Sequence, residues 1–286
     1  MKYILLLVKG FFIGIANIIP GVSGGTIAII LGIYEQLIST ISHFFSNLKE
    51  NLLFVIPIGI GLLVSIGVMS GVIEYSYDNF PVPTMMFFVG LVLGGIPMLM
   101  KNVINKKESK SPINFVIFLL TFCLVIFMSL SGLIFGTSLV DLSNLNFAGY
   151  LLLFCIGVVA AATMVIPGIS GSLVLMLLGY YYPIVSIVHE LVKFKNIPNN
   201  ILILGVFGLG VVFGIVFISK LLEMLFKNYK VKTYFGVLGF IFASIIAIPV
   251  STILEHVSLD ISLATGIISI IMLVVGSIVS YKLGDK

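Results

Sequence analysis

Two short segments of the chain carry the same combination of proline, glycine and hydroxyl side chains. The first reads Pro-Gly-Val-Ser-Gly-Gly-Thr at residues 20–26, and the second reads Pro-Gly-Ile-Ser-Gly-Ser at residues 167–172. Proline ends a helix because it lacks a backbone N–H, and glycine permits the positive φ angles of a tight reversal. Free backbone N–H groups beside hydroxyls at a helix start can hold an anion such as phosphate or carboxylate. The chemistry predicted for both segments is therefore anion binding.

In the first segment, Ser23 and Thr26 can cap an outgoing helix that starts near Ile27, and Gly21, Gly24 and Gly25 permit the positive φ angles of a tight reversal. The second segment is expected to do the same. The predicted phosphate-binding set is Ser23, Gly24, Gly25, Thr26, Ser170, Gly171 and Ser172. If the two segments meet, one anionic group would lie between two positive helix ends.

Two other readings of these segments stay open. Small residues also let membrane helices pack closely, although packing does not explain hydroxyls at matching positions in both copies. Gly-x-Ser-Gly is also the nucleophile motif of rhomboid-type intramembrane proteases, and a serine nucleophile needs a nearby base. The chain has only His43, His189 and His256, and sequence position places none of them beside a motif serine. No catalytic residue is therefore predicted.

Five further side chains near the segments are candidates for function. A charged, unpaired carboxylate at membrane depth costs roughly 3 kcal/mol, so Glu35 is read as a proton-coupling group, a counter-ion to Lys9 or an interfacial residue. Lys9 either contributes charge to the anion site or marks the cytoplasmic side. Asn17 has an amide that contacts the ligand or caps freed carbonyls. Tyr34 and Tyr181 occupy matching positions after the two segments and are candidate gating aromatics.

The composition indicates that the elements positioning these residues are membrane helices. Hydrophobic residues make up 60% of the 286 residues and charged residues 9%, and the mean hydropathy is +1.27. Apolar runs reach the roughly 20 residues that a helix needs to cross a bilayer. The net charge of +4 comes from lysine alone, and such an excess reports membrane orientation rather than a nucleic-acid partner. Neither Cys123 nor Cys155 implies a metal site or a cofactor.

The two segments lie within a longer repeat with a constant spacing of 147 positions, from Pro20 to Pro167. Gly32 matches Gly179 at the same spacing. We therefore predict one membrane domain over residues 1–286, with repeat one at about 1–139 and repeat two at about 147–286.

Lysine-rich stretches at 101–111 and 220–232 are predicted to be cytoplasmic by the positive-inside rule, as are both termini. Lys193 and Lys195 fall in a loop that this scheme puts outside. Full spans are then expected near 52–73, 82–100, 114–136, 201–219, 233–253 and 261–281. Crossing counts make residues 1–45 and 148–190 re-entrant helical hairpins from opposite faces. The predicted fold is an all-α polytopic membrane protein with two inverted repeats, each a hairpin plus three transmembrane helices, a layout typical of secondary transporters.

The chain resembles the DUF368 family of bacterial membrane proteins, which are described as undecaprenyl-phosphate (polyprenyl-phosphate) transporters of the PopT type. The resemblance is carried by Gly-Ile-Ala-Asn-Ile-Ile-Pro-Gly-Val-Ser-Gly-Gly-Thr at 14–26 with Gly-Ile-Tyr-Glu at 32–35. The second copy is Ala-Ala-Thr-Met-Val-Ile-Pro-Gly-Ile-Ser-Gly-Ser at 161–172 with Gly-Tyr-Tyr at 179–181. One departure is Tyr182, where the family's second repeat often has glutamate, which argues against a second coupling carboxylate.

The resemblance implies a flippase that returns undecaprenyl phosphate from the outer to the inner leaflet of the bacterial plasma membrane for envelope polymer synthesis. Its partners would be the polyprenyl phosphate and membrane lipids, and coupling to protons or sodium stays open. The alternatives are an ion-coupled secondary transporter of another anionic solute and an intramembrane enzyme acting on a lipid phosphate. The enzyme is disfavoured because Glu35 is the only acid or histidine near either segment.

Overall fold

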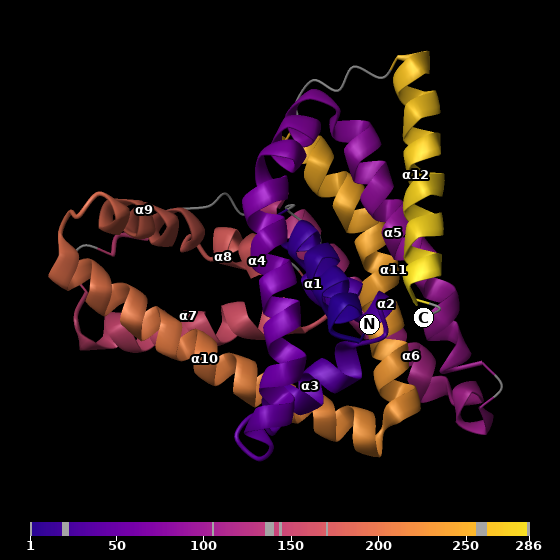
Figure 1. Ribbon diagram of the computed structural model, residues 1–286, viewed down its shortest axis with the longest axis horizontal. Helices are drawn as coiled ribbons and strands as arrows, with labels where there is room; N and C mark the ends of the chain where they lie inside the picture. The colour runs from indigo at the N-terminus through magenta and orange to yellow at the C-terminus, as the bar shows by residue number, and fades with distance from the viewer. Residues whose placement is uncertain are drawn as a thin grey trace.

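The computed structural model describes residues 2–18, 23–104, 106–134, 140–142, 145–169, 171–255 and 262–284. Regular structure within these ranges is helical throughout, which confirms the all-α prediction (Figure 1). The helices before residue 140 are α1 (Lys2–Ile18), α2 (Gly24–Ile30), α3 (Tyr34–Ser42), α4 (Leu48–Asn79), α5 (Pro81–Lys101), the short 3-10 helix η1 (Lys107–Lys110) and α6 (Pro112–Ile134). Those after it are α7 (Phe147–Val165), α8 (Gly171–Leu177), α9 (Tyr181–Val192), α10 (Ile197–Asn228), α11 (Lys230–Glu255) and α12 (Leu263–Gly284).

Seven helices in the described ranges are long and apolar enough to cross a membrane. Six of them match the predicted spans, namely Leu48–Met69, Pro81–Lys101, Pro112–Leu130, Ile197–Asn228, Lys230–Val250 and Leu263–Lys282. The seventh, Phe147–Val165, is the first arm of the second predicted hairpin. The chain is thus a multi-pass helical membrane protein. The approach of the two hairpins from opposite faces stays a prediction.

Each predicted hairpin contains a sharp helix end at a glycine. Gly32 follows α2 with a φ of 69°, and Gly179 follows α8 with a φ of 78°. After Gly32, the N–H of Ile33 bonds the carbonyl of Ala28 at 3.1 Å, and after Gly179 the N–H of Tyr180 bonds that of Leu175 at 2.9 Å. This is a Schellman cap, which glycine favours because it adopts left-handed angles without strain. In the first hairpin the cap leaves α3 bent by 116° from α2.

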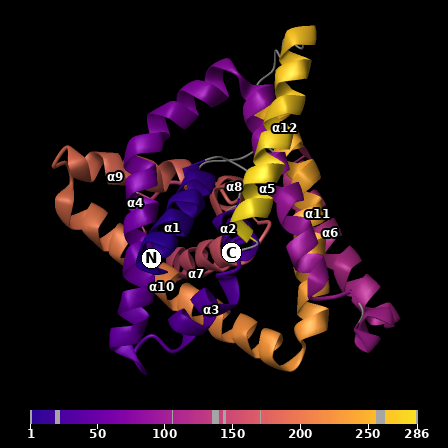
Figure 2. The same cartoon turned by 45° about the vertical axis from the view of Figure 1, so that its right-hand side comes forward.

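Long helices pack in pairs, and the last helix of each predicted repeat packs against the other repeat. α1 lies along α4 and α7 along α10, while α12 lies along α5 and α6 along α11 (Figure 2). Glycines allow the close approach: a Cβ at Gly10 would lie 2.1 Å from the Ile58 carbonyl oxygen, and one at Gly157 would lie 2.4 Å from that of Phe207. Close helix packing is thus a role of glycines outside the motifs as well.

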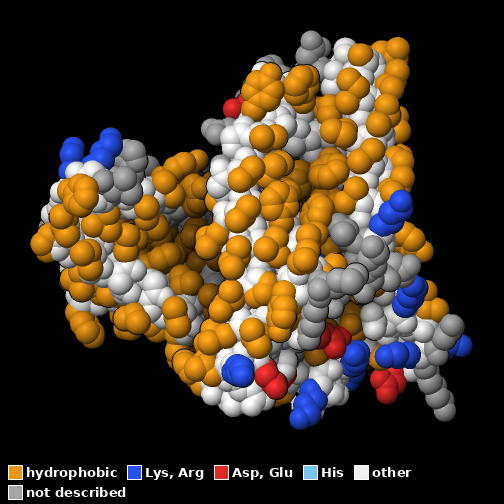
Figure 3. Space-filling model, viewed as in Figure 1, with side chains coloured by type: hydrophobic (Ala, Val, Ile, Leu, Met, Phe, Trp, Pro, Cys, Tyr) orange, Lys and Arg blue, Asp and Glu red, His pale blue; other side chains and the backbone are white. Residues whose placement is uncertain are grey.

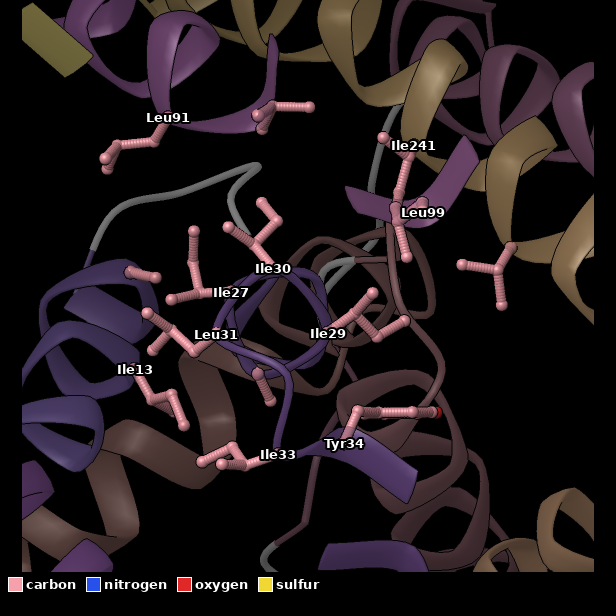
Figure 4. Close-up of a cluster of buried hydrophobic side chains, with 14 of the residues drawn as sticks. Ile13, Ile27, Ile29, Ile30, Leu31, Ile33, Tyr34, Leu91, Leu99 and Ile241 are labelled. Carbon is pink, nitrogen blue, oxygen red and sulfur yellow. The ribbon is translucent and has the colours of Figure 1, made fainter. Parts of the chain in front are cut away.

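The short helix α2 lies at the centre of the main hydrophobic core. Its residues Ile27, Ile29 and Ile30 are buried on all sides of the helix, and Figure 4 shows them pointing outward around the α2 axis. Leu91 and Ile241 belong to the same core cluster and come from α5 and α11. A helix that is apolar all round is stable only inside a protein or lipid. The core thus fixes α2, and with it the first motif, between distant parts of the chain.

The contacts of the two hairpins differ. In the first hairpin, α3 packs along α10 and α2 also touches α7. In the second hairpin, α9 packs on α8 and α10, so α7, α9 and α10 form an arm that extends to the left in Figure 1. The order and lengths of the helices recur along the chain, but their contacts are asymmetric. The division into inverted halves stays a prediction.

Apolar side chains cover the outward faces of the long helices. Leu63 on α4, Leu120 on α6, Leu209 on α10 and Ile270 on α12 are all exposed, as lipid-facing residues are (Figure 3). Lysine side chains in this view lie on the α9–α10 arm, at the lower end of the molecule and on its right-hand side. The cytoplasmic assignment of the termini stays a prediction.

Candidate functional site

The two motifs meet in the structure through three hydrogen bonds. Thr26 Oγ1 accepts from the backbone N–H of Gly168 at 2.7 Å. Ser23 Oγ donates to the carbonyl oxygen of Ile166 at 3.5 Å. Tyr34, which opens α3, donates its hydroxyl to the carbonyl oxygen of Val165 at 2.8 Å. The sequence left open whether the two segments meet, and these contacts show that their described residues do.

The local geometry of the first motif differs from the prediction. The helix begins at Gly24 rather than near Ile27, with Ser23 at the N-cap position in an extended conformation and without a side-chain cap hydrogen bond. The Ser23 hydroxyl instead bonds across to the second motif. Gly24 and Gly25 are helical, and in the two motifs the positive φ falls at Gly168, with a value of 80°. The predicted capping and the predicted positive φ angles were therefore wrong at these residues.

Gly25 has a steric role in place of the conformational one. A Cβ at this position would lie 2.9 Å from the carbonyl oxygen of Val165. This distance is shorter than real Cβ contacts, so the second motif can approach α2 this closely only because residue 25 has no side chain. The absence of a Cβ is thus the property of Gly25 that the structure uses.

A pocket of about 340 Å³ lies where the motifs meet, and we name it the motif pocket. Its polar lining comes from Asn17, Ser23, Gly24, Gly25, Tyr34 and Gly171, and its apolar lining is mainly Ile13, Leu37, Ile38, Ile41, Met164 and Ile169. Ser23 is 6% exposed and Gly24 is buried, whereas Asn17 and Met164 are exposed, so the pocket runs from a buried end to an open one. The lining combines hydrogen-bonding groups on one part with hydrocarbon on the rest.

Five of the seven predicted phosphate ligands can be placed. Ser23, Gly24, Gly25 and Gly171 line the motif pocket. Thr26 does not: it is 1% exposed and its hydroxyl holds Gly168, so the structure makes it a brace between the motifs. Ser170 and the side chain of Ser172 lie outside the described part of the chain. Both α2 and α8 have only seven residues, so the hydroxyl, amide and backbone N–H groups carry much of the polarity of the pocket.

Asn17 and Met164 occupy matching positions, 147 apart, in the last turns of α1 and α7. Each lies against the first glycine of the following helix: a Cβ on Gly24 would be 2.6 Å from Asn17 Oδ1, and one on Gly171 would be 2.7 Å from Met164 Cγ. The motif pocket therefore has a polar amide at one of these positions and a thioether at the other. The repeat spacing could have identified Met164 as a lining residue.

Lys9 does not line the motif pocket, and its predicted role as a marker of the cytoplasmic side stays a prediction. It is 6% exposed, and its ammonium donates to the carbonyl oxygen of Leu31 at 2.7 Å. Leu31 is the C-cap of α2, where unpaired carbonyls favour a cation. Lys9 is therefore buried in the protein and binds the C-terminal end of α2, whereas the motif pocket lies at its N-terminal end.

Glu35 is not a counter-ion to Lys9. Its carboxylate pairs with Lys230 Nζ at 3.2 Å and accepts a hydrogen bond from the hydroxyl of Tyr234. The side chains of Glu35 and Lys230 are 43% and 45% exposed, which corresponds to the interfacial reading of Glu35. Sequence analysis missed Lys230 and Tyr234 because no local pattern links residues that lie 195 and 199 positions away.

The two candidate gating tyrosines differ in their surroundings. Tyr34 is buried and bridges to the second motif, and its ring packs edge-on against Phe226 of α10. Tyr181 packs edge-on against Tyr182 at 5.3 Å between ring centroids, within the second hairpin. Only Tyr34, of this pair, contacts the other motif among the described residues.

Fold and pocket together define a polytopic helical membrane protein whose two broken-helix motifs enclose one partly polar cavity, the architecture of a transporter. Residues 13–265 match the VCA0040-like family, described as undecaprenyl phosphate translocase-like, and the chain belongs to this family. It is similar to the polyprenyl-phosphate transporter of Staphylococcus aureus (strain NCTC 8325 / PS 47), with 33% identity over 99% of this chain and 96% of the relative. It is also similar to the polyprenyl-phosphate transporter of Vibrio cholerae serotype O1 (strain ATCC 39315 / El Tor Inaba N16961), with 29% identity over 80% of this chain and 72% of the relative.

No solved structure gives a significant match to the chain. The family match confirms the resemblance drawn from the motif residues and identifies a transporter rather than an enzyme.

Proposed function

We propose that this protein carries undecaprenyl phosphate from the outer to the inner leaflet of the bacterial plasma membrane, so that the carrier lipid is reused for envelope polymers. The phosphate monoester would bind in the motif pocket, through the Ser23 hydroxyl, the Asn17 amide and the backbone N–H groups at Gly24, Gly25 and Gly171. The observation that carries this proposal is the joint lining of one pocket by both motifs. The two relatives, both named polyprenyl-phosphate transporters, support the substrate class.

The apolar part of the pocket suits a headgroup that is attached to a hydrocarbon chain. Leu37, Ile38 and Ile41 line it from α3, and these residues follow the polar groups of α2 directly in the sequence. The long prenyl tail would remain in the lipid, where the exposed apolar faces of the long helices lie. A small soluble anion would gain nothing from contact with these apolar side chains, so the lining favours a lipid phosphate over a small solute.

The first test is headgroup competition on the purified protein. A ligand that binds the folded state raises the unfolding temperature in proportion to the logarithm of its concentration over its Kd. A short prenyl phosphate is expected to stabilise the protein at lower concentration than prenyl pyrophosphate or inorganic phosphate. Stabilisation by inorganic phosphate at the same concentration as by prenyl phosphate would instead identify a transporter of a soluble anion.

The second test replaces the motif hydroxyls in a transport assay with vesicles that carry labelled prenyl phosphate in one leaflet. The double variant Ser23→Val and Ser170→Val is expected to lose translocation while its unfolding remains cooperative. Ser269→Val is the matched control, because this buried hydroxyl donates to the Thr265 carbonyl within its own helix α12. Translocation at the wild-type rate in the double variant would overturn the proposed headgroup site.

Coupling to protons or sodium is part of the same proposal, with Glu35 as the ionisable group nearest the motifs on α3. The rate of translocation is measured against pH and against sodium concentration, in the wild type and in Glu35→Gln. Loss of the pH dependence in Glu35→Gln supports proton coupling through this carboxylate, and an unchanged dependence argues against it.

A further inference from the structure

A second pocket shares the lining residue Tyr34 with the motif pocket. It has a volume of about 380 Å³, and its lining includes Tyr34, Glu35, Asn102, Phe226, Lys230 and Tyr234, so we name it the lysine pocket. These residues come from the start of α3, the residue after α5, the end of α10 and the start of α11. Tyr34 lines both pockets. The buried side chain of Tyr34 thus borders both the proposed headgroup site and a second cavity.

The donors of the lysine pocket already hold an oxyanion that belongs to the protein. One oxygen of the Glu35 carboxylate lies 3.2 Å from Lys230 Nζ, and the other accepts from the Tyr234 hydroxyl. A phosphate monoester presents the same kind of oxygen at similar spacing with more negative charge, and lysine is a common partner for it. Because Glu35 and Lys230 are each nearly half exposed, this internal pair is weak enough to be exchanged for an incoming anion.

The Glu35–Lys230 ion pair is not needed to hold α3 in place. A second set of polar contacts, one and two helical turns after Glu35, also links α3 to its neighbour. Ser39 Oγ donates to Glu223 Oε1 at 2.9 Å, and His43 Nδ1 lies 3.3 Å from Glu223 Oε2. Residues 35, 39 and 43 lie on one face of α3, toward α10 and the start of α11. A structural link between α3 and α10 would thus survive the release of Glu35 from Lys230.

We propose that the lysine pocket is a second phosphate-monoester site, in which Lys230 and Tyr234 bind the phosphate oxygens after displacing the carboxylate of Glu35. This inference rests on the proposed function. In it, the lipid headgroup passes from the motif pocket to the lysine pocket when the hydrogen bond from the Tyr34 hydroxyl to the Val165 carbonyl breaks. The lysine pocket is then the station from which the headgroup leaves the protein.

The test measures binding of farnesyl phosphate and of inorganic phosphate to the full-length protein in detergent. Glu35→Gln removes the competing carboxylate and is expected to strengthen phosphate binding roughly two- to five-fold, the range for loss of a half-exposed ion pair. Lys230→Gln, added to Glu35→Gln, is expected to abolish that gain. Lys232→Gln is the matched control, since Lys232 begins the same helix but lies over the Tyr229 ring at 5.2 Å and does not line the pocket.

The outcomes separate this inference from the proposed function. A gain with both probes identifies the phosphate group as the ligand, and a gain with farnesyl phosphate alone identifies the lipid headgroup. Unchanged affinity for both probes in Glu35→Gln and in Lys230→Gln overturns the second site, even if Ser23→Val still weakens binding at the motif pocket. Conversely, a Lys230-dependent gain with normal translocation in the Ser23 and Ser170 double variant upholds the lysine pocket and removes the motif pocket from transport.

Discussion

The hydroxyl of Thr26 accepts a hydrogen bond from the backbone N–H of Gly168 at 2.7 Å, across 142 positions of the chain. This bond joins the middle of α2 to the turn that follows α7, and both of its atoms are buried. It fixes the relative position of the two motifs more directly than any ligand in the pocket could. The first prediction therefore concerns stability as well as transport.

Thr26→Val keeps the shape of the side chain and leaves the N–H of Gly168 buried without an acceptor. Leaving a buried donor unpaired costs about 1–3 kcal/mol, so the unfolding temperature should fall and translocation should fall with it. Thr26→Ser should recover most of both. Thr163→Val is the control, because the Thr163 hydroxyl bonds carbonyls of its own helix and its loss leaves no donor orphaned. Equal stability of the two valine variants would contradict the brace.

Gly25→Ala should push the two motifs apart. The added Cβ would lie 2.9 Å from the Val165 carbonyl oxygen, which belongs to the backbone and cannot rotate away. Overpacking of this kind costs about 1–3 kcal/mol, and the loss is read from thermal unfolding and from translocation. In Gly67→Ala nothing lies within 4 Å of the new Cβ, so the same change should stabilise α4 by up to about 1 kcal/mol. A neutral Gly25→Ala would show that the motifs do not need this contact.

Asn17→Met makes the two matching positions of the motif pocket alike. The variant loses the amide donor, so farnesyl phosphate should bind about ten-fold more weakly, the effect of one hydrogen bond to a charged group. The reverse substitution, Met164→Asn, adds an amide on the other side and should bind at least as tightly as the wild type. If Asn17→Met binds normally, the headgroup does not contact this corner of the pocket.

Lys9→Met tests whether the C-terminal end of α2, which Lys9 binds, influences ligand binding at the N-terminal end. Because Lys9 bonds the Leu31 carbonyl at the end of α2 that faces away from the motif pocket, its removal should leave the affinity for farnesyl phosphate within two-fold of the wild type. The affinity is measured by the same binding titration used for Asn17→Met. A loss of more than ten-fold would restore Lys9 as a charge partner of the anion.

The spans could be predicted from sequence because apolar length alone determines whether a helix can cross a bilayer, and the segments around α4–α6 and α10–α12 have that length. The repeat indicated that the two motifs are related, but not that they touch, because matching sequence does not place two segments side by side. The role of Lys9 could not be predicted, since its partner is the backbone carbonyl of Leu31, 22 positions away, which any residue there would offer. The Glu35–Lys230 pair depends on how α3 packs along α10, a tertiary contact that has no counterpart in the second hairpin. The spacing of residues in the sequence does not reveal this difference in packing between the two hairpins.

The chain bends by 116° between α2 and α3, so that residues of both helices line the motif pocket. Eight of the fourteen described residues that line the motif pocket come from positions 23–41, so its polar floor and much of its hydrocarbon wall are one uninterrupted stretch. Under the proposed function, one continuous stretch of sequence would contact both the headgroup and the first prenyl unit. Residues 23–41 should therefore determine ligand preference together. Exchanging this segment between relatives should transfer the preference, even when the rest of the protein is unchanged.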